Sequence, residues 1–458
     1  MALDPAIRIG VFHDDWQAVD YIVLSPGLDE GTLSNLGNTV TLEALHHAHL
    51  VKRWDSDRGT EQYHKYQFAE LWKVDKVGAT EATLQSRSAA YLNTRFERAG
   101  AYPDATGTVT SEAQAYALLR AVWSDDRAAF ERDWAWTGTH LSTADNLLSW
   151  RWKDGAVVDA NTAADADTDT ALALLLAGQR WNDPASREAG TRMVRAIWAR
   201  EVVMVRGMPY LTAGNWAGKA EVVALNPSYF APYAYQIFHD VDPEHDWTGV
   251  IDSSYRVLFA TSSESLGGSA STGLPPDWIG LDRDAPAGAS GLVPLQLGDD
   301  KGDTLRYSYD APRTFWRIAL HLRWNGDGRA AAYLSKTSFL QDEVTRLFAD
   351  GSTRKGRVSA AYERDGRVAR EAPSVVGTAG ALAALLTRDP ATANILYAGQ
   401  LVGGARTVNG GLAWGDPTDL YAQEWGWFAV ALYADALPNL WSGAAAPTTP
   451  AATTSATP

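Results

Sequence analysis

Apolar residues recur at helical spacing along most of the chain after about residue 83. The pattern predicts roughly eleven or twelve helices joined by short connections. The clearest of them are expected at 83–96, 111–126, 127–141, 143–152, 163–181, 184–203, 229–241, 246–265 and after 306. Because no Val/Ile-rich strands alternate with them and no fixed repeat period is visible, we expect an all-α fold, an (α/α)6 barrel built as a closed toroid of helical hairpins.

The two ends and one internal segment depart from this pattern. Residues 1–82 form an N-terminal extension, in which 11–24 is partly strand-like and 41–54 and 60–77 have helical spacing. Residues 262–304 are rich in Gly, Ser, Pro and Asp and predict a long irregular loop, a kind of segment that is often functional. Residues 442–458 are rich in Pro, Thr and Ala and are expected to be disordered. We therefore expect the helical catalytic domain to span 83–441.

Composition narrows the possible partners and chemistry. The formal net charge of -15 argues against nucleic acid, which is bound by basic patches. The absence of cysteine excludes disulfides, thiol catalysis and Cys-ligated metals. No stretch has the length and hydrophobicity of a membrane span, and the first residues lack the pattern of a signal peptide. The 19 tryptophans and 18 tyrosines raise the expectation of a carbohydrate-binding cleft, because such rings stack on sugars.

Three carboxylates stand at the start of one predicted helix. Asp165, Asp167 and Asp169 precede an apolar run that ends at Trp181. Aspartate is a preferred helix N-cap, and acidic groups are favoured near the positive end of the helix dipole. One interpretation is therefore that these residues only begin a helix. The other is that one of them faces a cleft, because three acids exceed what one cap needs.

Three neighbouring histidines raise the question of a metal site. His46, His47 and His49 lie close together, but neither an HExxH pattern nor a nearby set of acidic ligands accompanies them. We expect no metal and no cofactor.

Four motifs follow one another along the chain. Glu112 lies in TVTSEAQAY, Asp165 in AADADTDTALALLLAGQRW, Tyr229 in NPSY, and Asp310 in YDAPRTFWR. In this order they resemble the motifs of glycoside hydrolase family 8, whose patterns are V-S-E-G-Q-G-Y, A-[ST]-D-[AG]-D, N-P-S-Y and Y-D-A-x-R-x-P-W-R. The resemblance extends over about residues 88–437. It implies inverting hydrolysis of a β-1,4-linked polysaccharide, with a glucan as the first expectation.

The resemblance also implies roles for individual residues. Glu112 would be the general acid and Asp310 the general base, while Asp165 would hold and distort the sugar at the cleavage point. Tyr229 would help to place the attacking water, and Arg313 would fix Asp310 and keep it ionised. Inverting enzymes need two such carboxyl groups on opposite faces of the sugar. Further candidates for substrate binding are Tyr116 and Gln114 in the first motif and two possible sugar-stacking residues, Trp136 and Trp216.

The motifs also show departures that keep other functions open. Ala113 and Ala115 replace glycines beside the acid, and Ala164, Thr170 and Phe315 differ from the family pattern. One alternative is a carbohydrate-binding protein with impaired catalysis, and another is a hydrolase of xylan or chitosan. A lyase on a different helical toroid is disfavoured, because no convincing histidine constellation follows residue 64. A polysaccharide substrate suits a secreted or cell-envelope protein, and we expect a monomer.

Overall fold

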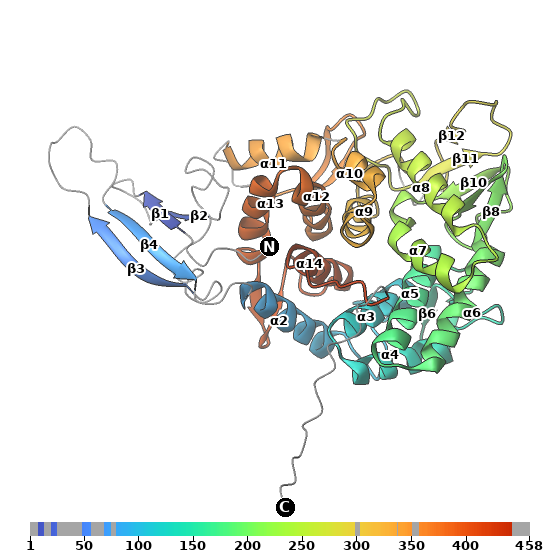
Figure 1. Ribbon diagram of the computed structural model, residues 1–458, viewed down its shortest axis with the longest axis horizontal. Coiled ribbons are helices and arrows are strands. Elements are labelled where there is room, and N and C mark those ends of the chain that lie inside the picture. The colour runs from blue at the N-terminus through green and yellow to red at the C-terminus, as the bar shows by residue number, and fades with distance from the viewer. Residues whose placement is uncertain are drawn as a thin grey trace, which may run out of the picture.

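The computed structural model describes residues 8–12, 20–24, 48–55, 68–74, 79–297, 303–336, 338–349 and 357–441. In the N-terminal extension it shows two antiparallel pairs of strands. Strand β1 (Arg8–Phe12) pairs with β2 (Asp20–Leu24), and β3 (Ala48–Asp55) pairs with β4 (Phe68–Val74). Figure 1 shows these strands to one side of the helices.

The strand-like reading of 11–24 is confirmed at β1 and β2, whereas the helices expected at 41–54 and 60–77 are wrong where these residues are described. Short apolar runs such as FAELWKV fit both the helical and the strand period. Pairing decides between them, with Leu50 opposite Trp72, and β3 also contains a register shift between Leu50 and Lys52. Of the three histidines, His46 and His47 lie outside the described residues, and His49 is in β3.

From residue 79 onward the chain is mainly helical, as the sequence predicts. The helix expected at 143–152 is wrong, because that segment consists of turns that lead into strand β6 (Arg151–Lys153). The helices are α2 (Ala79–Arg95), α3 (Ser111–Trp123), α4 (Arg127–His140), α5 (Ala164–Arg180), α6 (Pro184–Glu201), α7 (Pro232–Val241), α8 (Trp247–Thr261), α9 (Pro312–Asn325), α10 (Gly328–Leu334), α11 (Phe339–Ala349), α12 (Val375–Arg388), α13 (Pro390–Leu396) and α14 (Leu420–Tyr433).

These helices form two concentric layers. The inner helices α3, α5, α7, α9, α12 and α14 each contact the next, and α14 returns to contact α3, so the ring is closed. Outside them, α4, α6, α8, α10, α13 and α2 each pack mainly against one inner helix, and α6 and α10 also contact a second (Figure 1). This arrangement confirms the expected (α/α)6 barrel.

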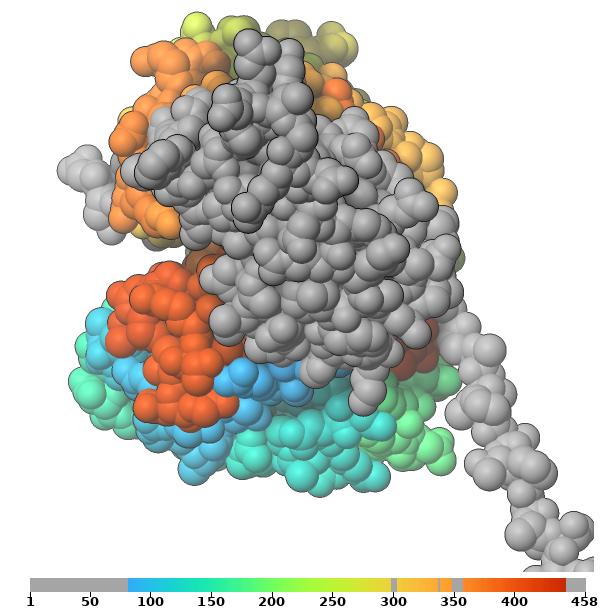
Figure 2. Space-filling model, turned by 90° about the vertical axis from the view of Figure 1, so that its left-hand side faces the viewer, coloured from blue at the N-terminus to red at the C-terminus, as the bar shows by residue number. Residues whose placement is uncertain are grey.

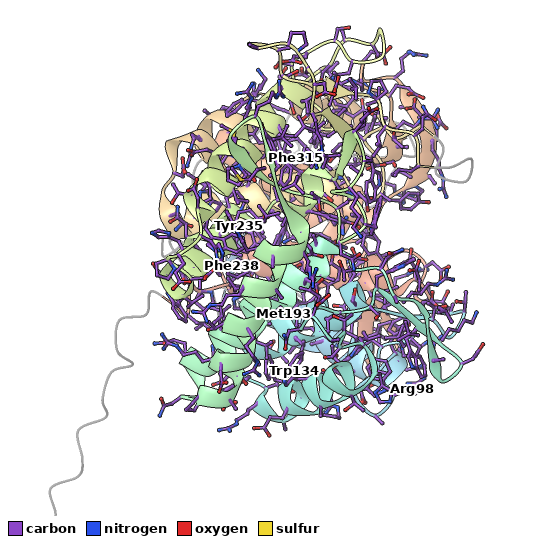
Figure 3. The ribbon with its side chains drawn as sticks, turned by 90° about the vertical axis from the view of Figure 1, so that its right-hand side faces the viewer. Arg98, Trp134, Met193, Tyr235, Phe238 and Phe315 are labelled. Atoms are coloured by element: carbon purple, nitrogen blue, oxygen red, sulfur yellow. The ribbon has the colours of Figure 1, made fainter. Side chains whose placement is uncertain are left out.

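Burial differs between the two layers. On α5, every residue from Ala164 to Gly178 is buried, whereas on the outer helix α4 only Ala129, Phe130, Asp133 and Thr137 are. A helix that is buried on all sides belongs to a core, and one with a single buried stripe covers it. The inner side chains include Tyr235, Phe238 and Phe315, which are fully or almost fully buried (Figure 3).

The connections between helices carry short antiparallel sheets. Strands β10 (Val222–Leu225), β11 (Ile279–Asp282) and β12 (Leu292–Val293) form one sheet, so the segment expected to be an irregular loop at 262–304 contains two of its strands. The other sheets contain β5 (Val109–Thr110), β6 and β7 (Ala156–Asp159), then β8 (Val202–Val205) and β9 (Met208–Leu211), β13 (Ser359–Tyr362) and β14 (Val368–Pro373), and β15 (Arg406–Val408) and β16 (Gly411–Ala413).

From α3 to α9 a single outer helix lies between successive inner helices along the chain, so these inner helices run in the same direction and begin at the same end of the barrel. Residues at the starts of α3, α5 and α9 are therefore brought together. Figure 2 shows the surface hollowed at the left of the view, between an orange segment and the red-orange segment below it. Within the described residues, no helix is both long and apolar enough to cross a membrane.

Candidate active site

The acid Glu112 lies in the first turn of α3. Thr110 is the N-cap of this helix, and its hydroxyl accepts a hydrogen bond of 3.2 Å from the backbone N–H of Ala113. Glu112 accepts a hydrogen bond of 3.0 Å from the hydroxyl of Tyr116 and keeps 28% of its side chain exposed, as a group that must meet a ligand requires.

The three acids of α5 have three different environments. None of them is the N-cap, because that position is Ala163, which makes no side-chain capping bond. Asp165 pairs with Arg313, and Asp169 forms a two-bond ion pair with Arg317, both bonds being 2.7 Å long. The interpretation that all three only begin the helix is thus wrong, since two of them bind cations from α9.

Asp167, by contrast, has no cationic partner among the described residues. Its carboxyl accepts a hydrogen bond of 2.8 Å from the backbone N–H of Leu148 and lies against the buried carboxyl of Glu201. Burial, followed by the nearby Glu201, raises the pKa of Asp167 well above its usual value.

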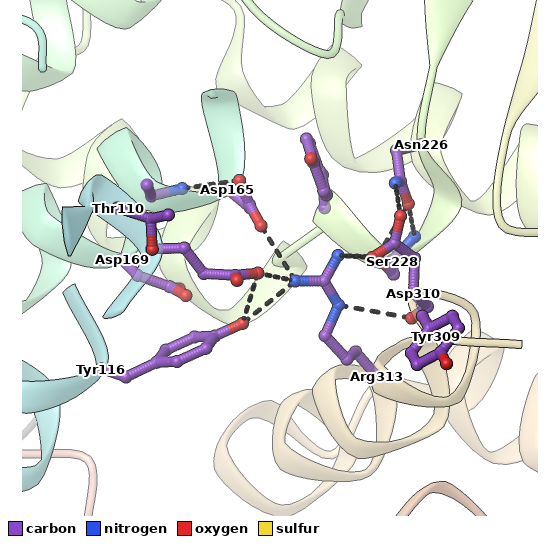
Figure 4. A network of polar contacts seen from close by, with 12 residues as sticks. Thr110, Tyr116, Asp165, Asp169, Asn226, Ser228, Tyr309, Asp310 and Arg313 are labelled. Carbon is purple, nitrogen blue, oxygen red and sulfur yellow. Dashed lines mark hydrogen bonds and ion pairs between the residues drawn. The ribbon is translucent and has the colours of Figure 1, made fainter. Parts of the chain in front are cut away.

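Arg313 is the centre of the site (Figure 4). It is buried in the first turn of α9, and its guanidinium contacts all three predicted catalytic carboxylates. One terminal nitrogen, Nη1, contacts Glu112 and lies 3.1 Å from Asp165, while the other, Nη2, lies 2.9 Å from Asp310. From the sequence, Arg313 was expected to bind Asp310 alone. In the structure it also contacts Glu112 and Asp165. A fixed planar cation with several donors is suited to hold several acids in one place.

Asp310 is held from two sides just before α9 begins. Arg313 binds its Oδ1, and the side-chain amide of Asn226 donates a hydrogen bond of 3.0 Å to its Oδ2. Glu112 and Asp310 bind opposite ends of one guanidinium, so their bound oxygens lie roughly 8 Å apart at most, given ordinary hydrogen-bond lengths. That upper limit overlaps the lower half of the separation of about 6.5–9.5 Å that inverting hydrolases use.

Aromatic side chains surround the guanidinium. Arg313 lies over the ring of Tyr229, 5.3 Å from its centroid, and 5.9 Å from that of Tyr421. The hydroxyl of Tyr116 bonds to it at 3.0 Å. Burial, followed by the charge of Asp165, raises the pKa of Tyr229 well above its usual value, so this phenol stays neutral.

Burial dominates the electrostatics of Asp165. Removal from water raises the pKa of this carboxyl to about 8, against the opposing effect of Arg313. A neutral Asp165 could donate a hydrogen bond to a hydroxyl, and an ionised one could accept it.

Three candidates from the sequence lie outside the contacts around Arg313. Gln114 is fully buried, and its amide is engaged with the backbone of Tyr102 and Gly100 and with Thr137. The structure therefore gives Gln114 a packing role rather than a place in a cleft. Trp136 stacks on His140 with 4.5 Å between ring centroids, and Trp216 is 38% exposed. Sugar stacking by either tryptophan remains a prediction.

Several residues of the site were not selected from the sequence. Asn226 and Ser228 belong to the NPSY motif, yet only its tyrosine was selected; Ser228 bonds to Arg313 at 2.8 Å. Asp277 bonds to the backbone around Asp310, and its only signal was the short GLPPDW segment. Nothing in the sequence distinguished Tyr421. Within the described residues, no group of three or more His, Asp or Glu side chains is placed to hold a metal ion.

Residues 90–357, more than half of the chain, match the model of the glycosyl hydrolases family 8. The chain belongs to glycosyl hydrolase family 8. An endoglucanase of Pseudomonas fluorescens (strain SBW25) is 33% identical over 236 residues, 49% of this chain and 56% of that protein. Endoglucanase A of Acetivibrio thermocellus is 30% identical over 304 residues, 63% of this chain and 55% of that protein. The matches thus span little more than half the length of these relatives.

Solved structures of the family share the fold. The β-1,3-1,4-glucanase from Paenibacillus sp. X4 has a TM-score of 0.65 and 22% identity, over 79% of this chain and 93% of that one. The endo-β-1,4-glucanase CMCax from Acetobacter xylinum has a TM-score of 0.59 and 21% identity, over 77% of this chain and 99% of that one. At this identity the likeness concerns the fold alone.

Proposed function

We propose that this family 8 chain hydrolyses a β-1,4-linked polysaccharide, in the first place a glucan, with inversion at the cleaved carbon. The observation that carries the proposal is the gathering of Glu112, Asp165 and Asp310 around Arg313 at the start of the inner helices. Family membership and the endoglucanase relatives support it.

The chemistry divides between two carboxyl groups. Glu112 gives its proton to the glycosidic oxygen as the bond from that oxygen to the anomeric carbon breaks. Asp310 takes a proton from the water that attacks this carbon from the opposite face, which inverts its configuration. Both groups have about a quarter of their side chain exposed, so substrate and water can reach them.

The remaining residues hold the substrate and the charges. Asp165 is almost fully buried beside Arg313 and is suited to bind a sugar hydroxyl at the cleavage point. Tyr229, whose ring lies against the guanidinium, is suited to orient the attacking water. Trp216 offers an exposed ring for stacking on a sugar, and Trp136 is a second candidate.

The direct test measures reducing sugar released from carboxymethyl cellulose, lichenan, xylan and chitosan. We expect the wild type to act most strongly on a glucan and Glu112→Gln to lose about 10²–10⁴-fold in kcat, the usual contribution of a general acid. The matched control is Glu131→Gln, which removes an exposed carboxylate paired with Arg127 and should retain full activity.

Two other outcomes would decide against parts of the proposal. Undiminished turnover by Glu112→Gln would remove Glu112 from the role of acid. Binding of these polysaccharides by the wild type without turnover of any would favour the carbohydrate-binding alternative, with Ala113 and Ala115 as the departures to examine. Preferred turnover of xylan or chitosan would keep the mechanism and change the substrate.

The setting follows from the proposed substrate. A polymer of sugars does not pass a membrane, so we propose that the protein is secreted or belongs to the cell envelope. We also propose that it acts as a monomer. Fractionation of the producing cells and the mass of the purified protein in solution test these two statements.

A further inference from the structure

Asp277 is a buried carboxylate that the reaction scheme above does not use. It follows two prolines in the segment between α8 and α9 and is 8% exposed. Its Oδ1 accepts hydrogen bonds from the backbone N–H groups of Ser308 at 3.1 Å, Asp310 at 3.0 Å and Ala311 at 2.7 Å. Its Oδ2 accepts a bond from the Ser308 hydroxyl. One side chain thus binds four donors from a single four-residue segment.

These bonds hold the segment that leads into α9, a helix without a side-chain cap of its own. The N-cap residue of α9 is Ala311, which has no side-chain oxygen to accept from the first turn. The next residue, Pro312, has no backbone N–H. A side-chain carboxylate near a helix start is normally provided by the N-cap residue itself and is favoured by the helix dipole. Asp277, more than thirty residues earlier in the chain, instead accepts from the N–H of the cap residue Ala311 and from residues just before the helix. The first-turn N–H groups of Arg313 and Thr314 bond to the backbone carbonyls of Asp310 and Ala311, both at 3.1 Å.

The same bonds fix the backbone of Asp310. The Asp310 side chain is held by Arg313 and Asn226, but both contacts leave the position of its Cα open. The Asp310 carbonyl accepts a bond of 3.1 Å from the Arg313 N–H, and the bond from the Asp310 N–H to Asp277 holds the other side of the residue. The bonds from the N–H groups of Ser308 and Ala311 to Asp277 fix the backbone before and after it.

We propose that Asp277 is a positioning residue for the general base: it sets the backbone from which Asp310 reaches the attacking water, without itself touching substrate. This inference rests on the proposed function in assigning Asp310 as the base. The geometry that carries it, four donors converging on one buried carboxylate, does not.

The charge of Asp277 and its hydrogen bonds can be separated by substitution. Burial, followed by the neighbouring Asp310 carboxylate, raises the pKa of Asp277 to about 7. An asparagine here would place its amide oxygen where Oδ1 accepts the three backbone bonds, and its NH₂ could donate to the Ser308 hydroxyl. Asp277→Asn therefore keeps the positioning and removes the charge, whereas Asp277→Ala removes both.

The first measurement compares kcat and KM of Asp277→Ala, Asp277→Asn and wild type on the best glucan. We expect Asp277→Ala to lose about 10²-fold in kcat, the effect of moving a reacting group by about 1 Å, with KM changed less than about threefold. Asp277→Asn should recover to within about tenfold of wild type. The matched control is Asp282→Ala, which removes another carboxylate bond to backbone in the same segment, 2.9 Å to the Asp284 N–H, and should leave kcat unchanged.

The second measurement does not depend on turnover. Hydrogen exchange of the backbone amides of Ser308, Asp310 and Ala311 should be slow in the wild type and in Asp277→Asn, and fast in Asp277→Ala, because those amides lose their acceptor. Unchanged protection in Asp277→Ala would overturn the positioning role, as would lost protection with an unchanged kcat. A wild type that cleaves no polysaccharide, with protection lost as expected, would instead overturn the proposed function while leaving Asp277 as the residue that fixes this backbone.

Discussion

Two acid–arginine pairs lie one helical turn apart on the same two helices. They contain the same residue types but differ in their bonding partners and in the exposure of those partners. Asp165 and Arg313 form the first, and Asp169 and Arg317 the second, each pair joining α5 to α9. In the second pair the carboxylate takes both ends of the arginine fork, and Tyr233 bonds to the guanidinium at 2.8 Å. Its two charges are paired with each other and are almost fully buried.

In the first pair, one arginine is divided among three carboxylates. Arg313 contacts Glu112 and Asp310 as well as Asp165, and the two additional acids reach the surface. One cation is thus shared among three acidic side chains, and burial opposes its effect at Asp165, whose pKa is raised to about 8. The comparison indicates that the ratio of acids to cations and their exposure separate a site that can do chemistry from an ion pair that joins two helices.

The strongest way to break this comparison is to remove each arginine in turn. Arg313→Met leaves the acid and the base without the group that holds them, and each contributes roughly 10²–10⁴-fold to such reactions. We expect kcat on a glucan to fall by at least about 10⁴-fold, measured on folded protein. Arg317→Met is the control and should keep kcat within about tenfold. Equal losses in the two variants would contradict the distinction between the pairs.

The converse effect concerns stability. Arg317→Met leaves the buried Asp169 without its partner, which typically costs about 3–5 kcal/mol in the free energy of unfolding. Urea unfolding measures it. The double variant Arg317→Met, Asp169→Leu removes the stranded charge and should regain most of that loss. A double variant as unstable as the single one would mean that the ion pair itself, and not the uncompensated charge, carries the stability.

Asp167 lies between the two pairs in the sequence and adds a prediction about how stability depends on pH. Its carboxyl faces the carboxyl of Glu201, whereas Asp165 and Asp169 each face an arginine. Burial raises the pKa of Glu201 to about 7, above the unfolded value of about 4.3. The stability from its protonated form is therefore fully present below about pH 4 and lost as the pH rises through about 7.

We expect the wild type to lose roughly 2–3 kcal/mol of unfolding free energy from this group between about pH 5 and about pH 8. Glu201→Gln, which cannot ionise, should show a flatter dependence. Unfolding of both proteins at the two pH values is the measurement. Identical slopes would show that Glu201 is not a source of the pH dependence.

The smallest expected effect concerns the start of α3. Thr110→Ala removes the N-cap bond to the Ala113 N–H and should lower the free energy of unfolding by about 1 kcal/mol, whereas Thr110→Ser should retain it. Thermal unfolding of the two variants tests this. A loss shared by Thr110→Ser would assign the effect to the missing methyl group instead of the cap.

Much of the barrel was accessible from the sequence because helical periodicity is local. The inner helices α5 and α9 were identified from their own apolar spacing and from the motifs at their starts. The strands β3 and β4 were not, because their apolar residues fit either period and their pairing joins segments that are distant in sequence. The segment after α8 was expected to be irregular for the same reason, since β11 pairs with β10 across more than fifty residues.

The site was predictable in its acids but not in its contacts. Glu112, Asp165 and Asp310 could be found because each has a motif, and helix starts at one end of a barrel meet. That Arg313 contacts all three depends on side-chain directions in three dimensions. Asp277 was missed because three of its four hydrogen bonds come from backbone N–H groups, which leave no trace in residue identities. Gln114 was misplaced because a motif position does not reveal whether an amide faces a ligand or the core.

The central claim is that the acids around Arg313 cleave a β-linked glucan by a single displacement, with Asp310 delivering the water. The most direct test follows the anomeric protons of the product by NMR in the first moments after wild-type enzyme meets a β-1,4-glucan oligomer. The α-anomer should appear first and relax to the equilibrium mixture afterwards, and no new anomer should form with Glu112→Gln. A first product in the β-configuration would contradict the account, because it would require a covalent intermediate in place of the water that Asp310 activates.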